Sequence, residues 1–238
     1  MAVIKPFECV RPNEKDAARV AALPYDVYNR QEAVCEVKRE PLSFLKIDRA
    51  ETQFDDSIDT YAPEVYAKAK ELFEEALADK TFITDTDKTY YIYALTMDKR
   101  TQTGIVACAS IDDYLNNVIK KHENTRADKE VDRITHVDTL SAQTGPIFLD
   151  YRADSVINDA VKKTKENKAL YDFISPDGIR HQVWKMTDIT LVENVRKAFE
   201  GIDSVYIADG HHRAATEEKV AVKRRQEKEN QSRESLAT

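Results

Sequence analysis

Glycine, histidine and cysteine are all scarce in this sequence. Its 238 residues include five glycines and seven prolines, which excludes collagen-like and low-complexity classes. The three cysteines are scattered and odd in number, so neither a disulfide framework nor a zinc finger is expected, and a reducing cytoplasm fits best. No stretch approaches about eighteen consecutive apolar residues, and the first residues lack the pattern of a secretory signal. The sequence therefore predicts a cytoplasmic protein without a membrane partner.

Apolar and charged residues, in contrast, are plentiful. Hydrophobic residues make up 42% of the chain and charged residues 33%. That is enough to bury a core in one large domain or in two small ones. The formal net charge of −7 argues against broad electrostatic binding of nucleic acid. We therefore expect small-molecule partners, and the composition leaves the oligomeric state open.

Strand and helix patterns alternate along the chain. The spacing of Val65, Ala69, Leu72 and Ala76 predicts an amphipathic helix. The polar residues 98–102 between two strand patterns predict one hairpin, and the Ser-Pro-Asp-Gly sequence at 175–178 predicts the turn of a second. Strands are predicted at residues 3–10, 42–47, 89–96, 103–109, 147–151, 170–174, 179–184 and 204–208. This alternation, with its hairpins, predicts an α+β fold in the broad sense of mixed α/β.

The chain is predicted to have one structured part and one tail. We expect residues 1–215 to form a single α+β domain or two intimately packed subdomains. Residues 216–238 mix both signs of charge on all sides, which predicts a charged helical or disordered tail.

One of the five glycines and two of the five histidines lie in one segment, directly after the predicted buried strand 204–208. There Asp209 and Gly210 precede His211, His212 and Arg213, and a helix begins near His211. Glycine permits a tight turn, a helix start offers unpaired N–H groups to an anion, and an arginine fork suits phosphate. The aspartate could hold a cation or take a proton, while two adjacent histidines point in different directions and do not make a closed zinc site. This segment predicts a phosphate or nucleotide site; the alternative is a capped turn with solvated histidines.

Two further clusters are weaker candidates for a functional site. Lys121, His122 and Glu123 offer a cation, an imidazole and a carboxylate, although a polar surface loop has the same composition. No histidine lies at the spacing of a zinc-protease helix. Tyr25 and Asp26 follow a proline and could line a pocket, or could form a turn packed by the tyrosine.

Taken together and in this order, these segments resemble domain-of-unknown-function family 1015. The resemblance covers the chain to about residue 215. It rests on the following segments: Ile4-Lys5-Pro6-Phe7, Leu23-Pro24-Tyr25-Asp26-Val27, Ser43-Phe44-Leu45, Asp112-Asp113-Tyr114, Lys121-His122-Glu123-Asn124-Thr125, Asp132-Arg133 and Tyr206-Ile207-Ala208-Asp209-Gly210-His211-His212-Arg213. Members of the family are usually longer, so we expect a truncated member, a half-length gene product or a piece of one.

More remotely, the strand–turn–helix unit is similar to the nucleotide loop of the ParB/sulfiredoxin superfamily. That resemblance implies a ParB-like core from residues 1–50 and 200–220, with a large α/β insertion at about 60–200. Free-serine kinases of the superfamily carry a closely similar Asp-Gly-His-x-Arg turn, which implies phosphoryl transfer from ATP or ADP with magnesium to a small hydroxyl substrate. The implied roles are phosphate binding by Gly210, His211, His212, Arg213 and Lys121, catalysis by Glu123, Asp26, Asp209 and His122, and metal binding by Asp209.

Three functions are compatible with these sequence features. A nucleotide-dependent small-molecule kinase is favoured, with Glu123 or Asp26 as the general base. A non-catalytic nucleotide- or DNA-binding regulator of the ParB type is the second. A metal-dependent phosphoesterase built on His122, Glu123 and His211 is the third. The substrate and the phosphate donor remain open.

Overall fold

Two hydrophobic cores organise the chain. This computed structural model describes residues 1–123 and 127–236. The larger core gathers Ala2 and apolar side chains from residues 90–214, and the smaller one gathers residues 20–82 and Leu140. Helices and small sheets are mixed along the whole length, so the predicted α+β fold class is confirmed.

A four-stranded antiparallel sheet lies at the centre of the larger core. Its strand order is β5-β4-β10-β9, and both predicted hairpins belong to it. Helix α7 contacts this sheet and also α8, and Ile92, Ile157 and Val195 are fully buried there. The elements are β4 (Tyr91–Met97), β5 (Arg100–Val106), β9 (Tyr171–Ile174), β10 (Arg180–Lys185), α7 (Ser155–Lys165) and α8 (Ile189–Glu200).

A three-stranded sheet carries the predicted site. Strand β11 (Val205–Asp209) lies between β7 (Ile119–Lys120), which is parallel to it, and β8 (Phe148–Asp150), which is antiparallel. Val205 and Ile207 are buried in the larger core. Because β11 is bonded on both edges, its carboxyl end is held in place where the chain enters the next helix.

Helices build most of the smaller core. Helix α4 begins with Pro63 at its first position, where a proline costs no hydrogen bond. Its Val65, Ala69, Leu72 and Ala76 are buried, as the periodicity predicts. The elements around this core are α1 (Ala17–Val20), the 3-10 helix η1 (Tyr25–Val27), α2 (Arg30–Arg39), α3 (Leu45–Asp48), the 3-10 helix η2 (Ala50–Gln53), α4 (Pro63–Ala78) and α6 (Ala127–Leu140).

Three predicted strands differ from the structure. The predicted strand 103–109 is divided between β5, which pairs with β4, and a short strand that pairs with the N-terminal segment. Residues 42–47 form the end of a turn and helix α3, because a helical turn buries both Leu45 and Ile47 against α4 and no neighbouring strand pairs with them in the described part of the chain. Residues 3–10 are split into short strands with different partners. These are β1 (Ile4–Lys5) with β6 (Cys108–Ala109), and β2 (Val10–Pro12) with β3 (Phe82–Thr84).

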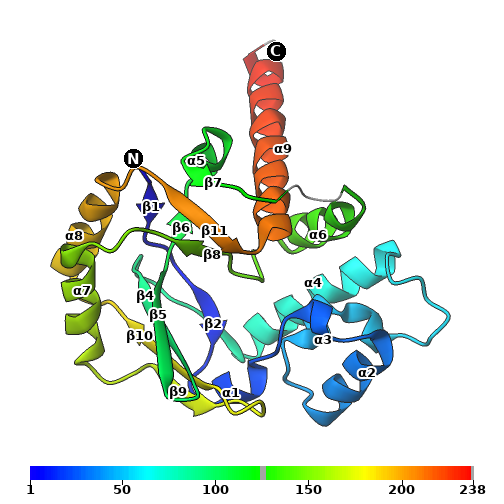
Figure 1. Cartoon of the computed structure of the whole chain (residues 1–238). Coiled ribbons are helices and arrows are strands. Elements are labelled where there is room, and N and C mark those ends of the chain that lie inside the picture. The colour runs from blue at the N-terminus through cyan, green and yellow to red at the C-terminus, as the bar shows by residue number, and fades with distance from the viewer. Residues whose placement is uncertain (124–126, 237–238) are drawn as a thin grey trace.

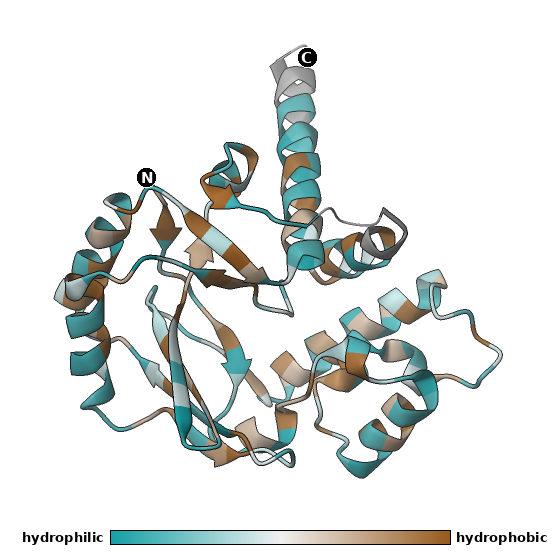
Figure 2. Cartoon of the chain, viewed as in Figure 1, coloured by the Kyte–Doolittle hydropathy of each residue, from teal (hydrophilic) through white to brown (hydrophobic). Residues whose placement is uncertain are grey.

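Helix α9 (His211–Leu236) begins at the site and extends away from the rest of the molecule (Figure 1). Lys223 and Arg224 bind Asp138 on α6, at 2.6 and 3.0 Å. Arg225 binds Asp112 on α5 (Ile111–Leu115) at 2.6 Å. The outer part of the helix is mostly hydrophilic on the side seen in Figure 2. Within the described residues, helices that combine the length and the apolar character needed to cross a bilayer are lacking.

Candidate functional site

The predicted strand, turn and helix meet at Gly210. Its φ of +91° lies in a region that side-chain-bearing residues rarely adopt. The Gly210 carbonyl accepts the first helical hydrogen bond of α9, from the N–H of Ala214 at 2.9 Å. A Cβ added at this glycine would lie 3.1 Å from Nε of Arg213. The turn therefore requires glycine both for its backbone and for the close approach of the arginine.

Arg213 is clamped between the turn and the segment that precedes β8. Its Nη2 donates to Oδ2 of Asp209 at 2.5 Å, and its Nη1 donates to the carbonyl of Pro146 at 2.5 Å. Gly145 also lies against it, since a Cβ there would be 3.1 Å from Cδ of Arg213. Asp209 thus compensates the charge of Arg213, and an anion at this turn has to share the guanidinium with that carboxylate.

Buried polar atoms without partners gather on the first two turns of α9. Among the described residues, four buried side-chain nitrogen or oxygen atoms make no hydrogen bond, and three of them are His211 Nε2, His212 Nδ1 and Thr216 Oγ1. The side chain of His211 is only 6% exposed. A buried polar group without a partner costs about 1–3 kcal/mol. Their concentration at a helix N-terminus, where backbone N–H groups also lack partners, marks a place where a polar ligand would be stabilised.

The structure brings two of the other predicted residues to this turn. The ring of His122 lies edge-on to that of His211 with centroids 4.3 Å apart. Oε2 of Glu123 lies 3.7 Å from Nδ1 of His211. Lys121 turns to Tyr114 on α5 instead, where its ammonium donates to the carbonyl and lies 3.7 Å from the ring centroid. Asn124 and Thr125 of the same motif lie outside the described residues.

The sequence reasoning missed Glu217, one helical turn after Arg213. Burial raises the pKa of this carboxyl to about 8, although the nearby charge of Arg213 acts in the opposite direction. A carboxyl group that keeps its proton near neutral pH beside a polar site is a candidate acid or base. In the sequence, Glu217 stands in a run of charged residues, which is typical of a solvated helix face. Its spacing of four from Arg213, next to the buried Thr216, is the signal that would have found it.

A metal site of protein ligands alone is not formed here. In the ranges that the structure describes, no three His, Cys, Asp or Glu side chains are grouped so that they could hold a metal ion. Asp209, the predicted metal ligand, offers a single carboxylate that is already paired with Arg213. Magnesium is often bound through one or two carboxylates together with substrate phosphates and water. Asp209 therefore fits a magnesium ion only together with a bound phosphate group.

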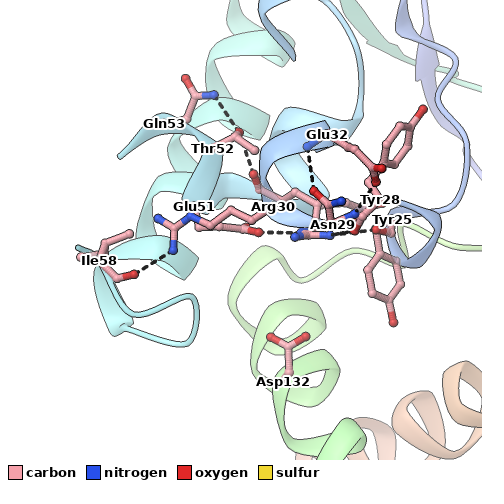
Figure 3. Close-up of polar contacts among 12 residues, drawn as sticks. Tyr25, Tyr28, Asn29, Arg30, Glu32, Glu51, Thr52, Gln53, Ile58 and Asp132 are labelled. Atoms are coloured by element: carbon pink, nitrogen blue, oxygen red, sulfur yellow. Dashed lines mark hydrogen bonds and ion pairs between the residues drawn. The ribbon is translucent and has the colours of Figure 1, made fainter. Parts of the chain in front are cut away.

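Asp26 lies elsewhere, in a pocket of about 250 Å³ between η1, η2, α4 and α6. Figure 3 shows Asp132 on α6 pointing across this pocket toward Tyr25 and Glu51. Tyr25 also lines this pocket. Of the two arrangements that the sequence allowed for Tyr25 and Asp26, the structure therefore has the one in which they line a pocket. The predicted Asp132-Arg133 pair belongs here as well, because Arg133 lies over the ring of Tyr25 at 4.3 Å.

A short segment links the pocket to the turn. Thr144 donates to Asp48, which lines the pocket, at 2.9 Å. The next two residues, Gly145 and Pro146, are those that contact Arg213. The two polar regions are therefore neighbours, held together through residues 144–146.

The fold and the turn define a class of protein: a mixed α+β chain with a glycine turn between a central strand and a long helix. The chain matches the family model described as "Protein of unknown function (DUF1015)" over residues 4–237, and it belongs to that family. No curated protein and no solved structure matches the chain. The family predicted from the motifs is thus confirmed. The likeness to the ParB/sulfiredoxin superfamily, with its division into core and insertion, stays a prediction.

Proposed function

We propose that the turn from Asp209 to Arg213 binds the phosphate groups of a nucleotide, ATP or ADP with magnesium, and that the protein transfers phosphate to a small hydroxyl substrate. The observation that carries this proposal is the set of buried polar atoms without partners on His211, His212 and Thr216, at the start of a helix behind a glycine with positive φ. Helix N-termini of this kind favour anions through their N–H groups and dipole.

The residues divide into a cradle and a proton acceptor. Gly210 permits the positive-φ turn that precedes the first N–H groups of α9, and Arg213 supplies a guanidinium next to it. Asp209 would hold magnesium with the phosphate oxygens. Glu123, at 64% side-chain exposure beside His211, is better placed at the turn than Asp26 to receive the proton of a substrate hydroxyl. Glu217 is a second candidate for proton exchange.

The proposed transfer involves only the substrate hydroxyl, the terminal phosphate of the nucleotide and the carboxylate of Glu123. The substrate oxygen forms a bond to the terminal phosphorus as the bond from that phosphorus to the leaving phosphate oxygen breaks. The hydroxyl proton passes to the carboxylate of Glu123, and the shortened nucleotide is the leaving group. Positioning and charge stabilisation supply most of the catalysis in such transfers.

A thermal shift experiment tests nucleotide binding. At about one hundred times Kd, a ligand adds roughly 2.7 kcal/mol of stability, which raises Tm by about 5–10 °C in a chain of this size. We expect this shift with magnesium and ATP or ADP, and its loss in Arg213→Ala and His211→Ala. Arg196→Ala is the matched control, because Arg196 also pairs with a carboxylate four residues away, at 2.5 Å, on the remote helix α8. An unchanged Tm with ATP, ADP and CTP at millimolar concentration would overturn the proposal.

One observation favours a second candidate function, a metal-dependent phosphoesterase. His122, Glu123 and His211 lie together beside the turn. Because these three described side chains are not grouped so that they hold a metal ion by themselves, this function would require substrate oxygens to supply much of the metal coordination. Hydrolysis of p-nitrophenyl phosphate with manganese, without nucleotide and abolished by His122→Ala, would support it against phosphoryl transfer.

A further inference from the structure

The pocket between η1, η2, α4 and α6 combines carboxylates with tyrosines. Four acidic side chains line it, and two of these are neutralised by a neighbouring arginine. Asp48 accepts from Nη2 of Arg133 at 3.2 Å, and Glu51 accepts from Nε of Arg49 at 2.5 Å. Arg49 also donates to two backbone carbonyls, of residues 25 and 28. These arginines are therefore already committed to partners of the protein itself.

The other two carboxylates have no counter-charge in the described part of the chain. Asp132 accepts a hydrogen bond from the hydroxyl of Tyr66 at 2.8 Å but lies within 4.0 Å of no described cation. Asp26 is exposed and forms no hydrogen bond or ion pair with a described side chain. Burial and the charge of Arg133 lower the pKa of His136, although Asp48 and Asp132 act in the opposite direction, so this buried imidazole is a poor source of counter-charge. The pocket thus carries a surplus of negative charge.

Aromatic rings form the walls between these carboxylates. Tyr25, Tyr28, Tyr61 and Tyr66 all line the pocket. Tyr66 is buried, at 8% exposure, whereas Tyr61 is 64% exposed. Aromatic faces attract cations, and aromatic cages are a typical site for organic ammonium groups. A volume of about 250 Å³ corresponds to roughly eight waters, so the ligand is small.

We propose that this pocket binds a small organic ammonium ion without a carboxylate, with Asp26 and Asp132 as its counter-charges and the tyrosines as its walls. A ligand carrying its own carboxylate would meet the surplus of negative charge and find the arginines already paired. A metal ion is disfavoured because the described residues offer no suitable group of three ligands. The inference goes beyond the proposed phosphoryl transfer and does not rest on it, because none of the residues of the turn lines this pocket.

Isothermal titration calorimetry on the full chain tests the pocket without any nucleotide. The probes are ethanolamine, choline and putrescine, with ethylene glycol as the neutral analogue and serine as the analogue that carries a carboxylate. We expect at least one of the three cations to bind at least tenfold more tightly than ethylene glycol and serine. Equal binding of the neutral analogue, binding of serine as tight as that of the cations, or no binding of any of the three cations would overturn the inference.

Variants locate the binding. Asp132→Asn should weaken the bound cation by about tenfold, which corresponds to about 1.4 kcal/mol, and Tyr61→Leu by several-fold. Asp26→Asn is a second variant that leaves the fold intact, since this side chain is exposed. Asp172→Asn, on the remote strand β9, is the control and should bind as the wild type does. Unchanged affinity in a folded Asp132→Asn or in Asp26→Asn contradicts the assignment.

The two proposals fail separately. Arg213→Ala should abolish the nucleotide shift and leave ammonium binding intact. Ammonium binding without any nucleotide effect would retain this pocket and remove the phosphoryl-transfer function. A nucleotide effect without ammonium binding would do the reverse.

Discussion

Replacing Gly210 by alanine tests the architecture of the turn directly. The backbone of the alanine must adopt the φ of +91° that Gly210 has, which costs about 1 kcal/mol for a residue with a side chain. It also lies 3.1 Å from Nε and 3.3 Å from Cζ of Arg213, so the guanidinium has to move. That movement breaks the ion pair with Asp209 and the hydrogen bond to Pro146, for about 1 kcal/mol more. We expect a total loss of about 2 kcal/mol in the free energy of unfolding.

Gly178 is a matched control for this substitution. Its φ is +84°, and a Cβ there would have nothing within 4 Å. Gly178→Ala therefore carries the same backbone cost, about 1 kcal/mol, without disturbing a neighbour. Any stabilisation that alanine adds by restricting the unfolded chain is common to both variants. The difference between them isolates the contact with Arg213.

Urea denaturation followed by circular dichroism measures both free energies, and the thermal shift with magnesium and ATP measures the functional effect. Gly210→Ala should unfold at a lower urea concentration than Gly178→Ala and should lose at least tenfold in nucleotide affinity, while Gly178→Ala retains it. If the two variants unfold together, or if Gly210→Ala binds nucleotide as the wild type does, the role assigned to this glycine is wrong.

Two further predictions concern buried charge. Asp48→Ala is expected to lower the free energy of unfolding by about 3 kcal/mol, since it leaves Arg133 buried without its carboxylate. Asp172→Ala, whose ion pair with Arg180 is exposed, should cost about 0.5 kcal/mol; a loss below about 1 kcal/mol for Asp48→Ala in urea denaturation would contradict this. The pKa of Glu217, raised from 4.5 to about 8, means that the folded chain keeps a proton which the unfolded chain releases, so this contribution to stability is full below pH 4.5 and falls as pH rises to about 8. Glu217→Gln should reduce the fall in Tm between those limits, and parallel pH profiles for the two proteins would contradict a half-buried, protonated Glu217.

Local chemistry made several elements predictable. The Ser-Pro-Asp-Gly segment forms the expected turn, with the N–H of Ser175 bonded to the carbonyl of Ile179 at 2.9 Å. The periodicity of α4 correctly marks its buried face. The turn at Gly210 was predictable because a buried strand, a glycine and a polar helix start follow one another directly in the sequence. In each case the residues that determine the structure lie within one or two turns of each other.

Other features depend on contacts between distant segments. The apolar residues near Leu45 fit a strand or a helical turn equally well, and packing against α4 decides for the helix. Glu217 resembles its charged neighbours in sequence, and only burial at the base of α9 raises its pKa. Asp132 belongs to the Asp132-Arg133 motif, but it lies opposite Tyr25 only because α6 packs against α4.

By itself, the sequence determined the α+β class, the family, the two hairpins and the glycine turn with its charged neighbours. These follow from hydrophobic period, turn chemistry and short spacings, which act locally. Only the tertiary structure decided that His122 and Glu123 meet His211 while Asp26 lines a separate pocket, and that residues 144–146 join the two places. Those placements depend on which helices and strands bury one another's apolar faces. That choice is made by the packing of segments tens of residues apart, which no local pattern records.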